Sequence, residues 1–241
     1  MSRQIDYQSV IRIPEEGIPE AEDERTLFSG IPAKKRDKID KILIPEAYIK
    51  ERIKALAQDV CRDYQNTDEL YLVTVLQGAF IFASDLGREI YRTFGLKGPE
   101  IKFDFIKAVT YGEEIKDSKE SERKVRIELK PRNLKGKNVI LIEDLVDQGF
   151  TLWKIKQHLL EKEALNSLKV CVLFNKVLKN PTREVREIKE KLAIDYLGFE
   201  IPDRWIAGYG IDAGGDFRHL PYIITVREDY YLNKTKRTFH A

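Results

Sequence analysis

The stretch Val139-Ile-Leu-Ile-Glu-Asp-Leu-Val-Asp-Gln-Gly-Phe-Thr151 decides the fold of this 241-residue chain. Its first four residues are apolar and largely β-branched, which is typical of a strand buried in a parallel sheet. Two adjacent acids, Glu143 and Asp144, end this run, and a short loop then leads into a helix that starts near Thr151. A strand, a loop and a helix in this order predict an α/β protein, whose ligands bind beyond the carboxyl ends of the strands.

The loop has the features of an anion site. A loop that enters a helix N-terminus offers free N–H groups and the positive end of the helix dipole. Gly149 permits close approach of the backbone, and Thr151 can cap the helix and donate a hydroxyl. Glu143 and Asp144 suit a ligand that also carries sugar hydroxyls and a hard cation such as Mg²⁺. The acid pair alone is equally compatible with helix capping in solvent.

Outward from this stretch, helical and extended patterns alternate, which predicts a mostly parallel sheet with right-handed crossovers. A charged helical insertion, expected on the surface, covers residues 183–192, and a long polar loop, extended at its end, covers residues 110–132. Residues 1–45 are interpreted as an N-terminal arm and residues 46–241 as the main domain. The other predicted helices cover residues 49–60, 81–91 and 151–163, and the strands cover 70–76, 101–106, 139–142, 168–174 and 194–199, with short strands between 205 and 226.

Composition narrows the class of protein. A net charge of +2 argues against nucleic acid or an anionic membrane as the main partner. No apolar leader is visible, and no stretch reaches the ~20 apolar residues that span a bilayer, so we expect a cytoplasmic enzyme or binding protein. Cys61 and Cys171 fall in buried patterns, and the three histidines are dispersed, so zinc-like spacing is absent.

The opening stretch resembles the phosphoribosyltransferase motif of the hypoxanthine-guanine phosphoribosyltransferase family. That motif is an apolar strand, Glu-Asp, two apolar residues, Asp, a small hydroxyl residue, Gly, any residue and Thr, and only Gln148 departs from it. Three more segments agree in order: Leu76-Gln-Gly-Ala-Phe80, Val109-Thr-Tyr-Gly112, and Gly198-Phe-Glu-Ile-Pro-Asp-Arg-Trp-Ile-Ala-Gly-Tyr-Gly-Ile-Asp212 followed by Phe217-Arg218.

The resemblance covers about residues 40–226 and implies a type I phosphoribosyltransferase fold. This fold is a mostly parallel twisted sheet flanked by helices, with a small hood formed by N- and C-terminal segments. The implied activity is purine salvage with Mg²⁺: transfer of phosphoribosyl from 5-phosphoribosyl-1-pyrophosphate to hypoxanthine and guanine, and possibly xanthine. The implied protein is a homodimer or homotetramer. The insertion at 183–192 is longer than the family pattern, which makes the alignment of Lys176 less secure than that of Asp212.

The resemblance also implies roles on the sugar-phosphate side. Asp147 would move the proton at N7 of the purine, and Glu143 and Asp144 would hold the ribose hydroxyls and a hydrated magnesium. Asp212 would bind a second magnesium, and Arg218 would meet the leaving pyrophosphate unless it forms a surface ion pair with Asp216 or Glu228. The 5′-phosphate would be held by Gln148, Gly149, Phe150 and Thr151. The first pyrophosphate loop would contain Gln77 and Gly78, with a non-proline cis peptide in that neighbourhood. Thr110 and Tyr111 would begin the closing loop.

The base side rests on four implied contacts. Trp205 would stack on the purine, although a tryptophan can also be buried for packing alone. Lys176 would donate to the 6-oxo group, unless it is a solvated strand end. The backbone of Arg204 and Ile206 would read the base edge.

Two other functions stay open at this point. A related transferase could use adenine or orotate, although the C-terminal signature argues against both. A protein of a different class, a regulator that senses 5-phosphoribosyl-1-pyrophosphate, could have kept the fold but lost the transferase activity. Asp147 favours an enzyme, whereas Gln148 is the one change that fits a sensor.

Overall fold

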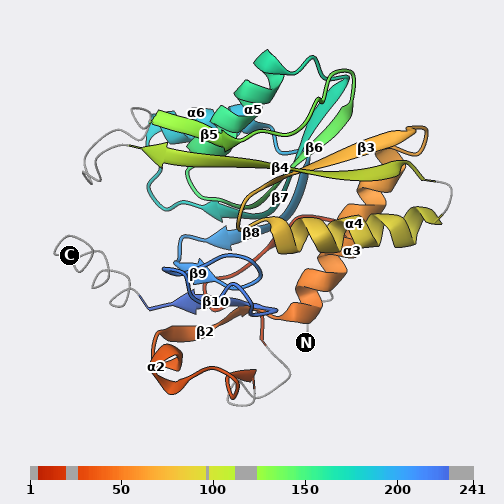
Figure 1. Ribbon diagram of the computed structural model, residues 1–241. Coiled ribbons are helices and arrows are strands. Elements are labelled where there is room, and N and C mark those ends of the chain that lie inside the picture. Colours follow the sequence, from red (N-terminus) through yellow and green to blue (C-terminus); the bar gives the residue numbers. More distant parts are fainter. Residues whose placement is uncertain (1–4, 20–26, 96–97, 112–123, 228–241) are drawn as a thin grey trace.

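A computed structural model of the chain describes residues 5–19, 27–95, 98–111 and 124–227 (Figure 1). Its main sheet has seven strands, and all neighbours pair in parallel except β4 and β5. The predicted α/β class with a mostly parallel sheet is therefore confirmed. In spatial order the strands are β1 (Ile11–Arg12), β8 (Tyr196–Pro202), β7 (Ser167–Val177), β6 (Asn138–Val146), β3 (Glu69–Val75), β4 (Glu100–Tyr111) and β5 (Lys124–Leu129).

Helices cover both faces of this sheet, α3 (Glu46–Asp63) and α4 (Phe80–Phe94) on one side, and α5 (Phe150–Lys162) and α6 (Arg183–Leu192) on the other (Figure 1). Strand β6 shows why its sequence is continuously apolar. Ile140 and Ile142 belong to the core under α3 and α4, whereas Val139 and Leu141 belong to the core under α5. Successive strand residues face opposite sides, so a strand covered on both faces needs apolar residues throughout.

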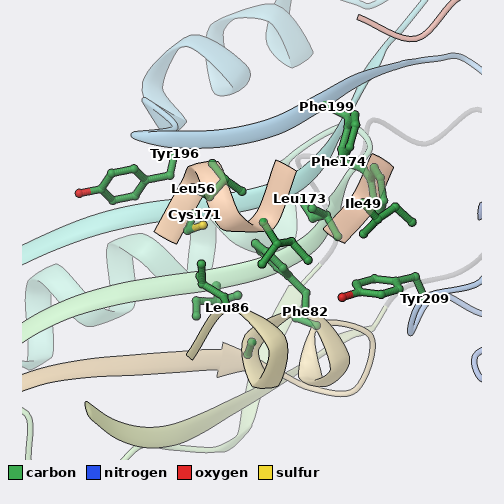
Figure 2. Packing of buried hydrophobic residues seen from close by; sticks show 14 of the residues in the cluster. Ile49, Leu56, Phe82, Leu86, Cys171, Leu173, Phe174, Tyr196, Phe199 and Tyr209 are labelled. Carbon is green, nitrogen blue, oxygen red and sulfur yellow. The ribbon is translucent and has the colours of Figure 1, made fainter. Parts of the chain in front are cut away.

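The larger core lies between the sheet and the helices α3 and α4. Figure 2 shows Ile49 and Leu56 of α3 facing side chains of α4 and of the central strands. Phe174 of β7 and Phe199 of β8 stack within it, with ring centroids 5.5 Å apart. Among the residues that the structure describes, no helix is long and apolar enough to cross a membrane.

A second, antiparallel sheet contains β2 (Ile39–Ile44), β10 (Ile223–Val226) and β9 (Ile206–Ala207), next to the short helix α2 (Ala33–Arg36). It joins an N-terminal segment to C-terminal ones, which agrees with the expected hood. Strand β1, from the same N-terminal arm, pairs instead with β8 of the main sheet. The arm therefore contributes to both sheets, and the boundary at residue 45 stays a prediction.

Several strands are longer than the sequence predicted, and two of these extensions include site residues. Strand β6 continues to Val146 and β7 to Val177, so Glu143, Asp144 and Lys176 lie within strands rather than after them. The cause is backbone pairing, which accepts polar residues: Glu143 is opposite Val172, and Lys176 is opposite Ile201. Of the predicted polar loop, residues 125–129 are extended in β5, and residues 112–123 lie outside the described part of the chain.

Candidate active site

The sequence motifs meet at the carboxyl ends of the central strands, as expected for an open α/β sheet. A pocket of about 1160 Å³ opens there between the loop after β6, the end of β7 and the segment between β8 and β9. Predicted site residues that line it are Asp147, Gln148, Lys176, Arg204 and Trp205. Its size and its few convergent polar groups suit a small organic ligand.

An ion pair lines the pocket. Lys176 Nζ is 2.8 Å from Asp147 Oδ2. The lysine side chain is 6% exposed and the aspartate side chain 46% exposed, so the ammonium is buried and the carboxylate faces the pocket. Lys176 is therefore no solvated strand end. A buried ammonium needs partners, because desolvation without compensation costs several kcal/mol.

Trp205 is the aromatic wall of the pocket. Its residue surface is 42% exposed, which excludes the alternative of a core tryptophan. Lys176 Nζ lies 5.2 Å from the centroid of the Trp205 ring. A flat ring with an exposed surface beside a donor and an acceptor is suited to a planar heterocycle. Stacking of a base on Trp205 remains a prediction.

The loop between β6 and α5 differs from the sequence prediction in one detail. Gly149 has a φ of +92° and is the N-cap of α5, so the helix begins at Phe150. Thr151 therefore lies in the first turn and is not the cap that we expected. A left-handed backbone suits glycine, and it turns the chain into the helix two residues early. Phe150 is buried, so only its backbone is available to a ligand.

The acid pair is buried rather than solvated. Glu143 and Asp144 are each 9% exposed, which excludes the alternative that they cap a helix in solvent. Burial, and then the charge of Asp144, raise the pKa of Glu143 well above its usual range. Asp144 Oδ1 accepts the N–H of Leu145 at 2.9 Å. Two adjacent buried carboxylates favour a cation, because a cation offsets both desolvation and repulsion.

Two glycines bring the separate loops together. A Cβ on Gly78 would lie 1.8 Å from Asp144 Oδ2, and a Cβ on Gly210 would lie 2.1 Å from the carbonyl oxygen of Gly78. The cis peptide bond is between Leu76 and Gln77, one residue before the expected Gln77–Gly78 neighbourhood. These contacts place the loop after β3 between the acid pair and the C-terminal signature.

Arg218 does not form the surface pair that we weighed as an alternative. Its Nη2 lies 2.5 Å from Asp212 Oδ1, and its Nη1 donates to the carbonyl of Gly210 at 2.6 Å. Asp216 pairs instead with Lys35 at 2.7 Å. The other considered partner, Glu228, lies outside the described residues. Arg218 and Asp212 are thus adjacent, as their expected roles require.

The candidate metal ligands, Glu143, Asp144 and Asp212, come from separate segments of the chain. In the part of the chain that the structure describes, no group of three or more His, Cys, Asp or Glu side chains converges on one point. Mg²⁺ usually keeps several waters and binds through one or two carboxylates plus substrate phosphates. The buried pair Glu143–Asp144 fits such an ion, and Asp212 offers a single carboxylate for another.

The remaining predicted site residues are Thr110, Tyr111, Arg204 and Ile206. Thr110 and Tyr111 close strand β4, and their side chains lie outside the described part. Ile206 is buried in β9. The N–H of Arg204 donates to the carbonyl of Pro202 at 2.8 Å, so this N–H can read a base edge only if that bond opens.

Two functional candidates were missed in the sequence. Lys189 of α6 donates to the backbone carbonyls of Asp147 and Lys176. Glu15 of the N-terminal arm accepts from Arg204 Nε at 3.0 Å. The sequence signal for Lys189 is its place on the apolar side of an amphipathic helix, four residues after Val185. Nothing in the sequence signals Glu15.

The fold and the site are those expected of a phosphoribosyltransferase, and comparison with known proteins agrees. Residues 43–213 match the phosphoribosyl transferase domain family. A hypoxanthine-guanine phosphoribosyltransferase of Dictyostelium discoideum is 35% identical over 191 residues, which cover 79% of this chain and 97% of that protein. A hypoxanthine phosphoribosyltransferase of Escherichia coli K12 is 35% identical over 183 residues, covering 76% and 92% respectively.

A solved structure agrees with these relatives. The crystal structure of a hypoxanthine-guanine phosphoribosyltransferase from Bacillus anthracis is 34% identical, with a TM-score of 0.64 over 79% of this chain and 99% of that one. The protein is thus a phosphoribosyltransferase of type I fold. Within that class, the chain belongs to the hypoxanthine-guanine phosphoribosyltransferase family.

Proposed function

We propose that this protein transfers a phosphoribosyl group from 5-phosphoribosyl-1-pyrophosphate to hypoxanthine and guanine in purine salvage. The observation that carries the proposal is the Asp147–Lys176 pair beside the exposed ring of Trp205. On a 6-oxopurine, the oxygen at position 6 and the nitrogen at position 7 share one edge. A donor-only ammonium next to a carboxylate complements that edge.

The proposed chemistry assigns each group one task. Trp205 stacks on the base, and Lys176 donates to its 6-oxo group. As N9 of the base attacks C1 of the sugar, the bond between C1 and the pyrophosphate oxygen breaks, and the Asp147 carboxylate takes the proton at N7. The N–H groups of residues 148–151 hold the 5′-phosphate at the start of α5, where the helix dipole favours an anion. Most donors there are backbone groups, so Gln148 can replace the usual hydroxyl residue.

Magnesium is the proposed cofactor, held by Glu143 and Asp144 at one position and by Asp212 at another. The ion would neutralise charge on the departing pyrophosphate when bound. Asp144 accepts hydrogen bonds from the ribose hydroxyls. Arg218 breaks its ion pair with Asp212 and donates hydrogen bonds to the pyrophosphate instead. Burial and the neighbouring Asp144 raise the pKa of Glu143, and a bound cation would offset both effects.

We also propose a cytoplasmic homodimer or homotetramer. Tyr91 and Phe103 support association, because they are 62% and 46% exposed and line one groove between α4 and β4. Exposed aromatic side chains that line a groove are typical of surfaces that bind another protein.

The direct test is a steady-state assay with each purine base, the activated sugar and Mg²⁺. We expect hypoxanthine and guanine to give their nucleotides and pyrophosphate, and a chelator to abolish turnover until Mg²⁺ is added back. A protein that binds the activated sugar yet converts no 6-oxopurine would instead be a regulator. Binding of the sugar alone, measured by calorimetry, separates that outcome from misfolding.

Gly78→Ala tests the contact between the first pyrophosphate loop and the acid pair. The added Cβ would meet Asp144 Oδ2, so we expect Asp144 to be displaced and the KM for the activated sugar to rise about tenfold, the scale of losing one hydrogen bond to a charged group. Gly30→Ala is the matched control, because a Cβ there has no neighbour within 4 Å. Equal KM values for Gly78→Ala and the control would remove Asp144 from sugar binding.

A further inference from the structure

The amino group of Lys189 connects two chain segments of the pocket. Its Nζ donates to the carbonyl of Asp147 at 2.8 Å and to the carbonyl of Lys176 at 2.6 Å. The first carbonyl belongs to the loop after β6 and the second to strand β7. A single ammonium that binds both carbonyls fixes the distance between these two backbones.

The surroundings of Lys189 favour this bridge over a surface position. Burial lowers the pKa of Lys189 to about 8, against attraction to Asp147. Desolvation of a lysine is compensated only by good acceptors, and the two carbonyls supply them. These bonds engage only the backbones of Asp147 and Lys176, so the paired side chains of both residues still line the pocket.

Helix α6 presses on the same loop through apolar contacts. A Cβ on Gly149 would lie 2.9 Å from Leu192 Cδ1 and 3.6 Å from Lys189 Cγ. Lys156 of α5 donates to the carbonyl of Leu192, which ties α6 to the helix that follows the loop. The helix that the sequence placed on the surface therefore has an inner side that supports the pocket.

We propose that Lys189 is a positioning residue that sets the spacing of Asp147 and Lys176 and thereby the choice of base. The proposal rests on the proposed function, because the spacing matters only if the two side chains read adjacent atoms of a 6-oxopurine. Lys189 does not line the pocket itself. It acts through the backbones of two residues that do, and misplacement of such groups by about 1 Å can cost ~10²-fold in rate.

The test compares Lys189→Met with Lys191→Met, a matched change on the exposed side of the same helix. Methionine has nearly the length of lysine but donates no hydrogen bond. We expect Lys189→Met to narrow the ratio of kcat/KM for hypoxanthine to that for adenine by about fivefold or more. Lys191→Met should leave it within about twofold. Lys189→Arg, whose guanidinium can serve both carbonyls, should keep the ratio within about threefold.

A ratio of efficiencies is independent of how much enzyme is folded, so a merely structural role would leave it unchanged. An unchanged ratio in folded Lys189→Met would overturn the proposal. Where adenine turnover is too slow, the ratio of the dissociation constants of IMP and AMP, measured by calorimetry, tests the same discrimination in binding, and we expect it to narrow as well. If Lys189→Met does not fold, Lys189→Leu, which also donates no hydrogen bond, takes its place with the same expected narrowing. Native protein that is inactive with hypoxanthine would instead contradict the proposed function.

Discussion

Asp147→Asn is expected to lower kcat by roughly 10²-fold or more with little change in either KM. Asparagine has the same shape and keeps an oxygen that can accept from Lys176, so the 2.8 Å contact survives. The amide cannot take the proton at N7, and general acid–base groups typically contribute ~10²–10⁴-fold. The loss should therefore fall on turnover rather than on binding.

The choice of asparagine matters because Lys176 is buried. Alanine would leave the ammonium without its carboxylate, and breaking a buried pair costs about 3–5 kcal/mol. That change would mix a loss of stability with a loss of proton transfer. Asparagine removes the negative charge but leaves a partner in place.

Initial rates at saturating hypoxanthine and activated sugar would measure the effect. Glu161→Gln, the same acid-to-amide change at an exposed position of α5, is the control and should retain native turnover. Thermal unfolding of both variants would show whether the fold is kept. Native turnover in Asp147→Asn would exclude this carboxylate from the mechanism.

The order of the elements was predictable from the sequence, but their ends were not. Apolar runs separated by helical spacing lead to one parallel sheet, because strands buried on both faces are apolar throughout. Hydropathy ends a strand at its last apolar residue, whereas the structure continues it as long as a neighbour pairs with it. Lys176 is within β7 because Ile201 of β8 lies opposite.

Some features of the candidate site were likewise predictable from the sequence, and others were not. The loop from Asp147 to Thr151 was located by its motif, since an anion cradle needs particular residues at fixed spacing. The sequence could not reveal contacts between distant loops, such as Gly78 on Asp144 or Arg218 on Asp212, because they depend on packing in three dimensions. Its prediction that Thr151 caps α5 was wrong, because the backbone of Gly149 already begins the helix there.

Lys189 shows what a composition-based interpretation overlooks. Residues 183–192 are mostly charged, which suggested a solvated helix. Val185 and Leu192 are nevertheless buried, and Lys189 lies between them on the same side. A lysine on the apolar side of an amphipathic helix therefore indicates a buried acceptor, although only the fold shows that the acceptors are carbonyls of the pocket.

Native enzyme is expected to prefer hypoxanthine over adenine by roughly 10⁴-fold in kcat/KM, and Lys176→Met is expected to narrow that preference. An ammonium group only donates, so it satisfies the oxygen at position 6 but not the amine of adenine. Lys176 is nearly inaccessible, so adenine would leave its charge facing a donor in a desolvated place. Sites built to hydrogen-bond an oxygen or amine reject analogues that lack it by ~10⁴-fold or more.

Removing the lysine acts oppositely on the two bases. Hypoxanthine loses a hydrogen bond from a charged group, which contributes about 1.5–3 kcal/mol, so its kcat/KM should fall ~10- to 150-fold. Adenine loses a repulsive contact with the ammonium group, so kcat/KM for adenine should fall less than that for hypoxanthine, or rise. The ion pair with Asp147 is also lost, which affects both bases alike and cancels in their ratio.

Lys154→Met, an exposed lysine of α5, is the control and should keep the native ratio. Native enzyme that uses adenine as efficiently as hypoxanthine would contradict both the role of Lys176 and the 6-oxopurine specificity. An unchanged ratio in Lys176→Met would contradict the role of the lysine alone, because the preference would then arise from the walls around Trp205.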